Sequence, residues 1–446
     1  MDENKSLLSK PGSALIAQPG LDDLLVLSSH ASGFKRENAV RRLGMLANPI
    51  AIPYLIGRVN DWVPQVRVAA RDALSRFLIA EHAAAWVASL PAVMHLQTCG
   101  RDDHSGLLRT VEEFLLRDEN SPQLVAALHS QDVGVARLAI RLLVERRQAM
   151  ATRVVAAGLV HTDVVVRSTV VDLLRRLEAE EFAVAVATAL RDTYMPVRRE
   201  AFQQLLLRDA EAGVRVARDM LFDPAASIRE IAVRRLLDAG EPVEQIYSRA
   251  LTGDKDRVAV VACVLWSWAY MNNHGRSEQV RQLLGARSPA VRRAALQTIA
   301  KLLRNGARSD VVAALADESP AVSKEAARLT TRMDDRPGAE ELVSIARASA
   351  RSHVAVACCR VARYAGKWDW LKVILKVYGA VDAPVTGEMF ASEIDAWEHH
   401  FNHSSAQPDK DSVSDIVAAL SVCEPKLSAH QMKLLKFTLR SYGAAL

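Results

Sequence analysis

The chain has 446 residues, a length that exceeds a single hydrophobic core and indicates several domains or one elongated array. Half of the residues are apolar and 5% are aromatic, while 57 basic and 52 acidic residues leave a net charge of +5. This small excess does not provide the strongly basic face of a dedicated nucleic-acid-binding protein. The five cysteines form no CxxC pair and no disulfide framework, so we expect buried, reduced thiols.

Residues 1–30 are expected to form an N-terminal arm and a first short helix from Leu21 to Leu27. The opening residues have no basic stretch followed by an apolar core, so we expect no secretory leader. The longest apolar run, from Val258 to Trp266, is too short to span a bilayer. We therefore expect a cytoplasmic protein that has no membrane partner.

A recurrent segment begins near residue 35 and combines a turn Asp, a Val-Arg or related pair, and an Ala-containing helical run. In the three clearest copies the Arg advances by 31 residues each time, from Arg167 to Arg198 to Arg229. They are preceded by a degenerate copy at 35–40, a good copy at 61–70 and further copies at 103–109 and 132–137. Between Arg67 and Arg109 the spacing grows to 42 residues, which predicts an insertion around residues 81–101. A fixed period of this size is typical of stacked helical repeats.

This pattern resembles the HEAT repeat in its short bacterial form, as in the PBS-lyase HEAT-like proteins. The resemblance covers roughly residues 30–360 and implies an all-α solenoid of antiparallel helix pairs, usually a protein-binding scaffold. The repeat also occurs in phycobilin lyases and in DNA alkylation glycosylases, so it is specific for fold and weak for function. We expect about ten or eleven helix pairs over residues 31–365, and a bacterial origin.

The repeat register is lost over residues 254–273, where the helix expected from Arg257 to Tyr270 is the most apolar in the chain. The register returns at 288–295, and the copy at 317–326 has Ser323 in place of the Arg. A last faint copy lies at 353–357. Beyond residue 365 the pattern stops, so residues 366–446 are expected to form a helical C-terminal cap over the last apolar face.

Each turn Asp is expected to accept hydrogen bonds from the free N–H groups that open the second helix of its pair. The repeated Arg lies beside the apolar stripe, and we expect it to pair with a turn Asp of its own or the adjacent repeat. Adjacent Arg pairs such as Arg146-Arg147 and Arg198-Arg199 leave open an array that reads phosphates. The acidic residues interleaved with them favour surface charge balance instead.

The positions one and five residues after the repeated Arg point away from the apolar face at about 100° per residue. The resemblance places the second helix of each pair on the concave side of the solenoid, so these positions would form an inner, partner-binding stripe. The alternative is a solvated helix face with intrahelical pairs such as Glu230–Arg234. The predicted stripe consists of Asp72, Ser168, Asp172, Arg199, Gln203, Glu230, Arg234, Arg293, Gln297, Lys324 and Arg328.

Two further clusters carry residue types that are suited to chemistry. Asp395, His399 and His403 share a helix face, but they match no metal motif, and an exposed helix end is the favoured interpretation. Trp266 and Tyr270, with Asp254 and Asp256 upstream, have the residue types of a glycosylase cleft, although core packing explains the aromatic residues better. We find no nucleotide-binding or nucleophile motif, and we expect no metal, cofactor or catalytic residue.

The sequence therefore predicts a non-enzymatic cytoplasmic scaffold that binds a protein partner along the concave face, as a regulator, assembly factor or inhibitor. One alternative is a DNA-binding solenoid enzyme of the alkylation-repair type. Another is a lyase-type chaperone for a tetrapyrrole. The oligomeric state and the partner are left open by the sequence.

Overall fold

The computed structural model describes residues 19–145, 151–253, 258–349, 351–380 and 387–445, and throughout these ranges the regular elements are helices without strands. The chain folds as an all-α solenoid of HEAT-like helix pairs with a helical C-terminal cap, as the sequence predicts. It divides into two compact units, Met1–Arg215 and Val216–Leu446. The predicted arm, Arg146, Arg147, Asp254 and Asp256 lie outside the described residues, apart from residues 19 and 20 of the arm.

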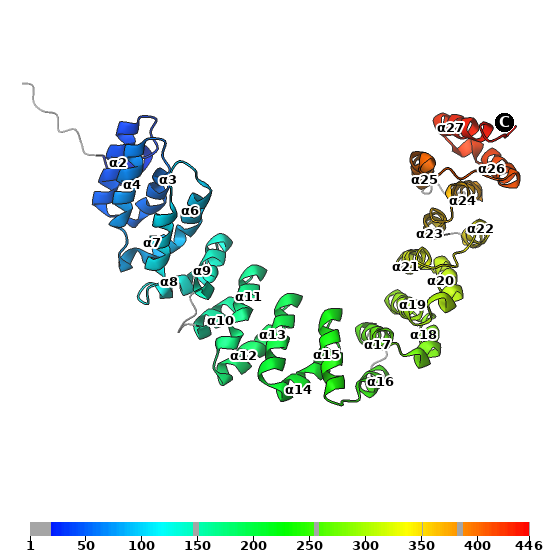
Figure 1. Cartoon of the computed structure of the whole chain (residues 1–446), viewed down its shortest axis with the longest axis horizontal. Helices are drawn as coiled ribbons and strands as arrows, with labels where there is room; N and C mark the ends of the chain where they lie inside the picture. Colours follow the sequence, from blue (N-terminus) through cyan, green and yellow to red (C-terminus); the bar gives the residue numbers. More distant parts are fainter. Residues whose placement is uncertain (1–18, 146–150, 254–257, 350, 381–386, 446) are drawn as a thin grey trace, which may run out of the picture. The chain divides into compact units, whose positions relative to one another are not determined.

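Figure 1 shows the helices in chain order. The first unit contains α1 (Leu21–Leu27), α2 (Gly33–Leu46), α3 (Ile52–Val59), α4 (Pro64–Ser75), α5 (Ala83–Ala88), α6 (Leu90–His95), α7 (Ser105–Leu115), α8 (Ser121–Ala126), α9 (Val133–Glu145), α10 (Ala151–Leu159), α11 (Val164–Val170) with the 3-10 turn Val171–Arg176, α12 (Ala179–Ala189) and α13 (Met195–Arg208). Helix α14 (Ala210–Met220) contains the boundary between the units.

The second unit continues with α15 (Ala226–Asp238), α16 (Val243–Gly253), α17 (Val258–Tyr270), α18 (Ser277–Leu283), α19 (Pro289–Leu303), α20 (Arg308–Ala313), α21 (Pro320–Thr330), α22 (Ala339–Ala348), α23 (Ser352–Ala362), α24 (Lys367–Ala380), α25 (Gly387–His400), α26 (Lys410–Cys423) and α27 (Ala429–Arg440). The predicted division at residues 30 and 365 stays a prediction.

Each repeat consists of a first helix, here the A helix, and a second helix, the B helix. Within the second unit the B helices α17, α19, α21 and α23 pack side by side, with the A helices α16, α18, α20 and α22 on their other side (Figure 1). Within the first unit α2 packs on α4 and α9 on α11 in the same way. Layers of this kind bury an apolar face that no single pair can bury alone.

The spacing of apolar residues explains which face each B helix buries. In α4, Val66, Ala69, Ala70 and Ala73 recur at intervals of three and four and are fully or almost fully buried. Proline occupies the first helical position of α4, α19 and α21, where its missing N–H costs little. The predicted insertion is present as the short helices α5 and α6, and Trp86 of α5 is fully buried.

Two of the six turn Asp residues cap their helices in the predicted way. One is Asp132, which accepts hydrogen bonds from the N–H groups of Gly134 and Val135 of α9. The other is Asp163, which is the N-cap of α11 and accepts hydrogen bonds from the N–H groups of Val165 and Val166. The prediction is wrong for four others, which lie two residues before the N-cap and bind the N–H of the N-cap residue instead of the N–H groups inside the helix: Asp61, Asp192, Asp223 and Asp317. This position makes a tight turn and leaves the rest of the carboxylate for a second partner.

The cap is held by an aromatic cluster. Trp368 of α24 makes edge contacts with Trp397, Phe401 and Tyr442, at centroid distances of 6.1, 5.6 and 4.9 Å. The indole N–H of Trp397 donates to the carbonyl of Lys367 at 2.6 Å, so the polar edge of this buried ring is satisfied. No helix in the described part of the chain combines the length and apolar character needed to cross a bilayer.

Candidate partner-binding site on the B helices

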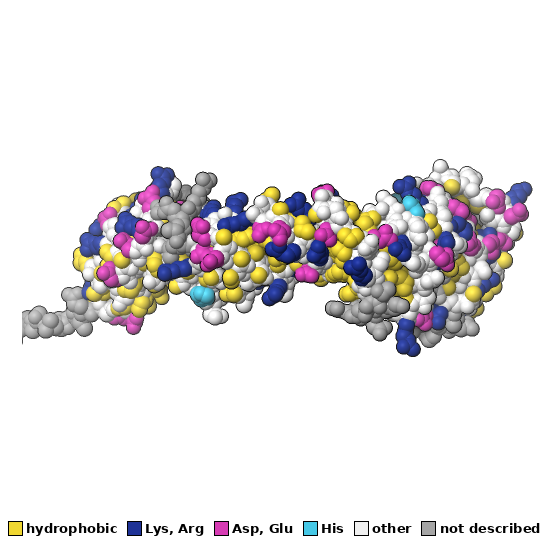
Figure 2. Space-filling model, turned by 90° about the horizontal axis from the view of Figure 1, so that it is seen from below, with side chains coloured by type: hydrophobic (Ala, Val, Ile, Leu, Met, Phe, Trp, Pro, Cys, Tyr) yellow, Lys and Arg dark blue, Asp and Glu magenta, His cyan; other side chains and the backbone are white. Residues whose placement is uncertain are grey.

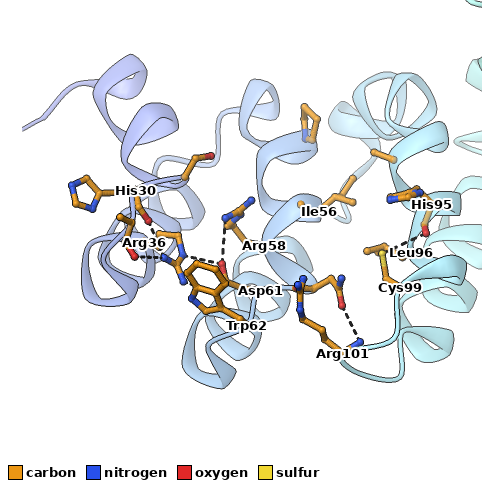
Figure 3. Close-up of a pocket in the computed structure, with 16 residues that line it drawn as sticks. His30, Arg36, Ile56, Arg58, Asp61, Trp62, His95, Leu96, Cys99 and Arg101 are labelled. Atoms are coloured by element: carbon orange, nitrogen blue, oxygen red, sulfur yellow. Dashed lines mark hydrogen bonds and ion pairs between the residues drawn. The ribbon is translucent and has the colours of Figure 1, made fainter.

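The repeated Arg joins neighbouring repeats. Figure 3 shows the first example, Arg36 of α2, whose Nε and Nη2 donate to the Asp61 carboxylate at 2.9 and 2.7 Å. Its Nη1 donates to the carbonyl oxygens of His30 and Ala31, six and five residues earlier. Both side chains of the Arg36–Asp61 pair are almost fully buried, with 2% and 3% exposed. We call this arrangement a rung.

The same rung recurs along the chain. Arg167 donates to Asp192, and Arg292 donates to Asp317, again through Nε and Nη2 and again 25 residues apart. In both cases Nη1 binds the carbonyl oxygens six and five residues earlier. Arg137 pairs with Asp163 through the same fork. The predicted structural role of the repeated Arg, pairing with the Asp of the adjacent repeat, is confirmed for these residues.

The pairs with Arg137 and Arg36 favour the charged form of the carboxylates of Asp163 and Asp61. The hydrogen bond from Arg137 lowers the pKa of Asp163 to about 2, although partial burial opposes the shift. Burial of Asp61 raises its pKa, but the hydrogen bond from Arg36 and the N–H of Val63 outweigh burial and hold the pKa below its ordinary value. An ionised carboxylate next to the guanidinium gives the strong, charge-assisted form of the hydrogen bond.

A cavity of about 450 Å³ lies beside the first rung (Figure 3). Its charged groups are engaged by the fold, because Arg36 and Arg58 both bind Asp61, and Arg101 donates to the carbonyl of Asn60. Its thiol, Cys99, lies 3.6 Å from the carbonyl of His95. We therefore assign this cavity a structural role.

The predicted stripe lies on the solvent side of the B helices. Glu230 and Ser168 are partly exposed, and the other stripe residues are exposed: Asp72, Asp172, Arg199, Gln203, Arg234, Arg293, Gln297, Lys324 and Arg328. Desolvation, followed by repulsion from Glu200, raises the pKa of Asp172. Glu230 and Arg234, both among the described residues, form no ion pair with each other. The partner-binding role of the stripe stays a prediction.

Three stripe residues are brought together around Glu325. Gln297 of α19 donates to Glu325 Oε1 at 2.9 Å, and Arg328 of α21 donates to Oε2 at 3.0 Å. The Arg328 hydrogen bond lowers the pKa of Glu325, burial opposes it, and Gln297 and the charge of Arg293 support it. This cluster fixes the orientation of neighbouring B helices and leaves the Arg293 guanidinium on the surface.

A groove of about 590 Å³ interrupts the polar stripe above α17. Its floor is apolar, because Ala259, Ala262 and Trp266 are the partly or fully exposed positions of α17 there. Arg293 and Lys301 of α19 line one side, and Arg229 of α15 lines it on the side of the preceding repeat. The α17 groove is lined by Phe222, Pro224, Arg229, Ala259, Ala262, Cys263, Trp266, Ala269, Ala290, Arg293, Ala294, Gln297, Thr298 and Lys301.

The groove continues toward α21. A second hollow of about 580 Å³ shares Gln297 and Lys301 with it and adds Arg304, Arg328 and Arg332 to its lining. Arg293, Gln297 and Arg328 of the predicted stripe therefore line one continuous path over the B helices. The path is basic along α19 and α21 and apolar over α17.

Arg229 differs from Arg36, Arg167 and Arg292. Its Nη1 donates to the carbonyl oxygens of Asp223 and Pro224 at 2.7 and 2.9 Å, as in a rung. Its Nε is buried and has no hydrogen-bond partner, and the residue is only 8% exposed. The guanidinium instead lies over the ring of Trp266, 4.3 Å from the centroid. Trp266 in turn stacks on Tyr270 at a centroid distance of 5.0 Å.

The sequence did not identify this groove as a site. Core packing was the favoured interpretation of Trp266 and Tyr270, and it is correct only in part, because both side chains are partly exposed, whereas Trp268 is 1% exposed. The available signal was the pattern of α17, where Ala262 and Trp266 replace the polar stripe. Cys263 lies in the groove lining, and burial raises the pKa of its thiol.

The second chemical cluster does not assemble a ligand set. His399, His400 and His403 lie near one another, with centroid distances of 5.1 to 6.3 Å, and all three are exposed. Asp395 accepts a hydrogen bond from Gln431 of α27 at 3.1 Å. Within the described ranges, no group of three His, Cys, Asp or Glu side chains is placed to hold a metal ion.

Charge is mixed on the face of the molecule that Figure 2 shows. On the face shown in Figure 2, basic and acidic side chains are interspersed among hydrophobic ones, and neither sign forms a continuous field. A duplex-binding surface requires a basic patch that tracks the phosphates.

Comparisons with known proteins give no family assignment. No family model matches the chain, and no curated protein matches it. Among solved structures, Kap95p in its complex with RanGDP is 13% identical, with 95% of this chain and 69% of that chain covered and a TM-score of 0.35. The karyopherin Kap121p bound to the SUMO protease Ulp1p is 13% identical, with 90% and 51% covered and a TM-score of 0.33. Importin beta is 12% identical, with 93% and 68% covered and a TM-score of 0.30.

Proposed function

We propose that this protein is a non-enzymatic cytoplasmic scaffold that holds a protein partner along its B helices, as a regulator, assembly factor or inhibitor. The observation that supports this function is the α17 groove, where an apolar floor with a partly exposed Trp266 interrupts a polar surface. Aromatic and Arg side chains in such a setting are typical anchors of protein interfaces. The arginines and Lys301 along the groove add the charged groups that set orientation and association rate.

The rung arrangement suits a scaffold. Most repeated arginines are used to fix one repeat against the next, so the B helices present a preformed surface. A preformed surface loses less conformational entropy on binding than a mobile one. The partner-binding residues are then the exposed stripe and the α17 groove rather than the buried Arg and Asp.

Charge reversal on the B helices tests this function. The triple variant Arg199→Glu, Arg234→Glu and Arg293→Glu should abolish co-purification of the native partner with the full-length chain while leaving helical circular dichroism unchanged. A matched control reverses exposed arginines of the A helices α10, α14 and α22, namely Arg153, Arg215 and Arg347. Unchanged partner recovery with the B-helix variant, or equal loss with the control, would refute the B-helix surface as the binding site.

A further inference from the structure

The Arg229 guanidinium is oriented as in a rung, but it has no carboxylate partner among the described residues. In the rungs of Arg36, Arg167 and Arg292, Nη1 is fixed by two backbone carbonyl groups, and Nε and Nη2 face an Asp. Arg229 keeps the two carbonyl contacts, so its guanidinium has the pose of a rung. Its Nε is buried and unpartnered at the point where the other rungs bind Asp.

A buried, charged donor without a partner is unfavourable, and a bidentate carboxylate is the ligand that matches a guanidinium fork. The stack with Trp266 compensates only the face of the guanidinium and leaves its edge unsatisfied. Arg229 lines the α17 groove, so a ligand in that groove lies next to its guanidinium.

The other residues that line the groove determine which groups next to the bound carboxylate are favoured. Arg293 and Lys301 are exposed along α19 and favour further negative charge. Glu325, the acidic group next to them, is already bound by Gln297 and Arg328. The small side chains of Ala259 and Ala262 beside Trp266 leave space for an apolar or aromatic side chain.

We propose that the α17 groove binds an acidic segment of the protein partner, with one Asp or Glu carboxylate on the Arg229 fork and a neighbouring apolar side chain over Trp266. The partner would thus supply the carboxylate that a neighbouring repeat supplies in the other rungs. This inference rests on the proposed scaffold function and names the chemistry of the bound segment.

Binding of a defined peptide to the full-length chain provides the test. The probe is a short fluorescein-labelled peptide in which Asp and Glu alternate with Leu and Phe, and the reference peptide carries Asn and Gln in place of the acids. Fluorescence anisotropy should show at least roughly tenfold tighter binding of the acidic peptide, the size expected for one charge-assisted bidentate contact. Equal binding of the two peptides would overturn the inference.

Two Arg229 variants localise the contact. Arg229→Gln and Arg229→Lys should both lose the preference for the acidic peptide, because Lys keeps the charge but lacks the fork. Arg292→Gln, which breaks a complete rung outside the groove lining, should keep it. If the Arg229 variants bind the acidic peptide as the wild type does, the receptor assignment is wrong. Duplex DNA that competes in an Arg229-dependent manner would assign the site to nucleic acid instead.

The chain's own Asp254 is the competitor, since it lies 25 residues after Arg229 and outside the described residues. Asp254→Asn should leave urea stability and peptide preference unchanged. If it destabilises the protein as much as Asp317→Asn, the chain fills its own rung and the inference fails. The two proposals can fail separately. If the B-helix triple variant loses the native partner while the Arg229 variants bind the acidic peptide with unchanged affinity, the scaffold function is retained and carboxylate binding by Arg229 is refuted.

Discussion

Arg292 shows what a complete rung contributes to stability. Its side chain is 7% exposed and that of Asp317 is 13% exposed, so removal of the guanidinium leaves a mostly buried carboxylate without its main partner. We expect Arg292→Gln to lower the free energy of unfolding by about 2–4 kcal/mol. The next residue is the control, because Arg293 is exposed and Arg293→Gln should change stability by less than about 0.5 kcal/mol. Urea denaturation followed by circular dichroism measures both, and similar effects of the two variants would contradict the structural role of the rung.

The Arg137–Asp163 rung makes stability depend on pH in the acidic range. The pKa of Asp163 is lowered to about 2 in the folded chain, from roughly 3.9 in an unfolded one. A lowered folded pKa gives stabilisation that is complete above the unfolded value and is lost as the pH falls through the folded value. The stability difference between wild type and Asp163→Asn should therefore be largest above about pH 4 and should shrink toward pH 2. A difference that is constant from pH 5 to pH 2 would show that this carboxylate does not titrate with the fold.

At the scale of single residues, the sequence predicted which residue types pair better than it predicted the geometry of the pairs. The period of 31 residues identified Arg167, and the turn pattern identified its partner class, because both recur in every clear copy. It did not predict that Asp192 would lie two residues before the N-cap, since the turn conformation depends on where the neighbouring repeat places its guanidinium. The sequence also did not predict that the Nε of Arg229 lacks a partner, because the residue type matches the pattern and only its surroundings differ.

Helices α2 and α4 approach closely at a glycine. A Cβ added to Gly44 would lie 2.7 Å from the Cβ and 3.0 Å from the Cα of Ala73 on α4. We expect Gly44→Ala to destabilise the protein by about 1–3 kcal/mol, because the helices must separate to accept the methyl group. The matched control is Gly57→Ala in α3, where no atom lies within 4 Å, and this variant should stabilise by about 0.5–1 kcal/mol through helix propensity. Thermal melts of the two variants that shift in the same direction would contradict this close contact.

Helix α17 shows why hydropathy alone cannot identify the exposed side of a helix. Its sequence is apolar almost throughout, which is typical of a buried helix. In a stack of repeats, however, each B helix has one side that no other repeat covers. Trp266 and Ala262 occupy that side, and the amphipathic signal that would reveal it is absent because both sides are apolar. The groove could be located only after α15 and α19 were placed beside α17.

The division into two compact units predicts unfolding that is not all-or-none. Repeat arrays gain stability from nearest neighbours, so distant repeats are coupled weakly. Calorimetry should give a van't Hoff enthalpy below the calorimetric enthalpy. In urea, Arg292→Gln should shift the transition of the second unit and leave that of residues 1–215 in place. A single transition that moves as a whole with this variant would show that the units unfold together.

Fold class was predictable at the scale of the molecule because many weak repeats support one architecture. Copies as irregular as the one with Ser323 still occupy a B helix, where its hydroxyl donates to the carbonyl of Leu315 at 2.7 Å. The proposed binding site was not predictable in the same way. It depends on the surroundings of Arg229 and Trp266, which differ from those of a complete rung although the residue type of Arg229 fits the repeat.

The constant separation within a rung also has a consequence for editing the gene. Each complete regular rung joins residues 25 positions apart, and the clearest repeats have a period of 31 residues. Removal of residues 168–198 would join Arg167 to Arg199 and bring Asp223 to the twenty-fifth position after Arg167. A deletion of one full period thus preserves phase, much as three bases preserve a reading frame, whereas a cut that is not a whole number of periods sets a guanidinium opposite the wrong side chain.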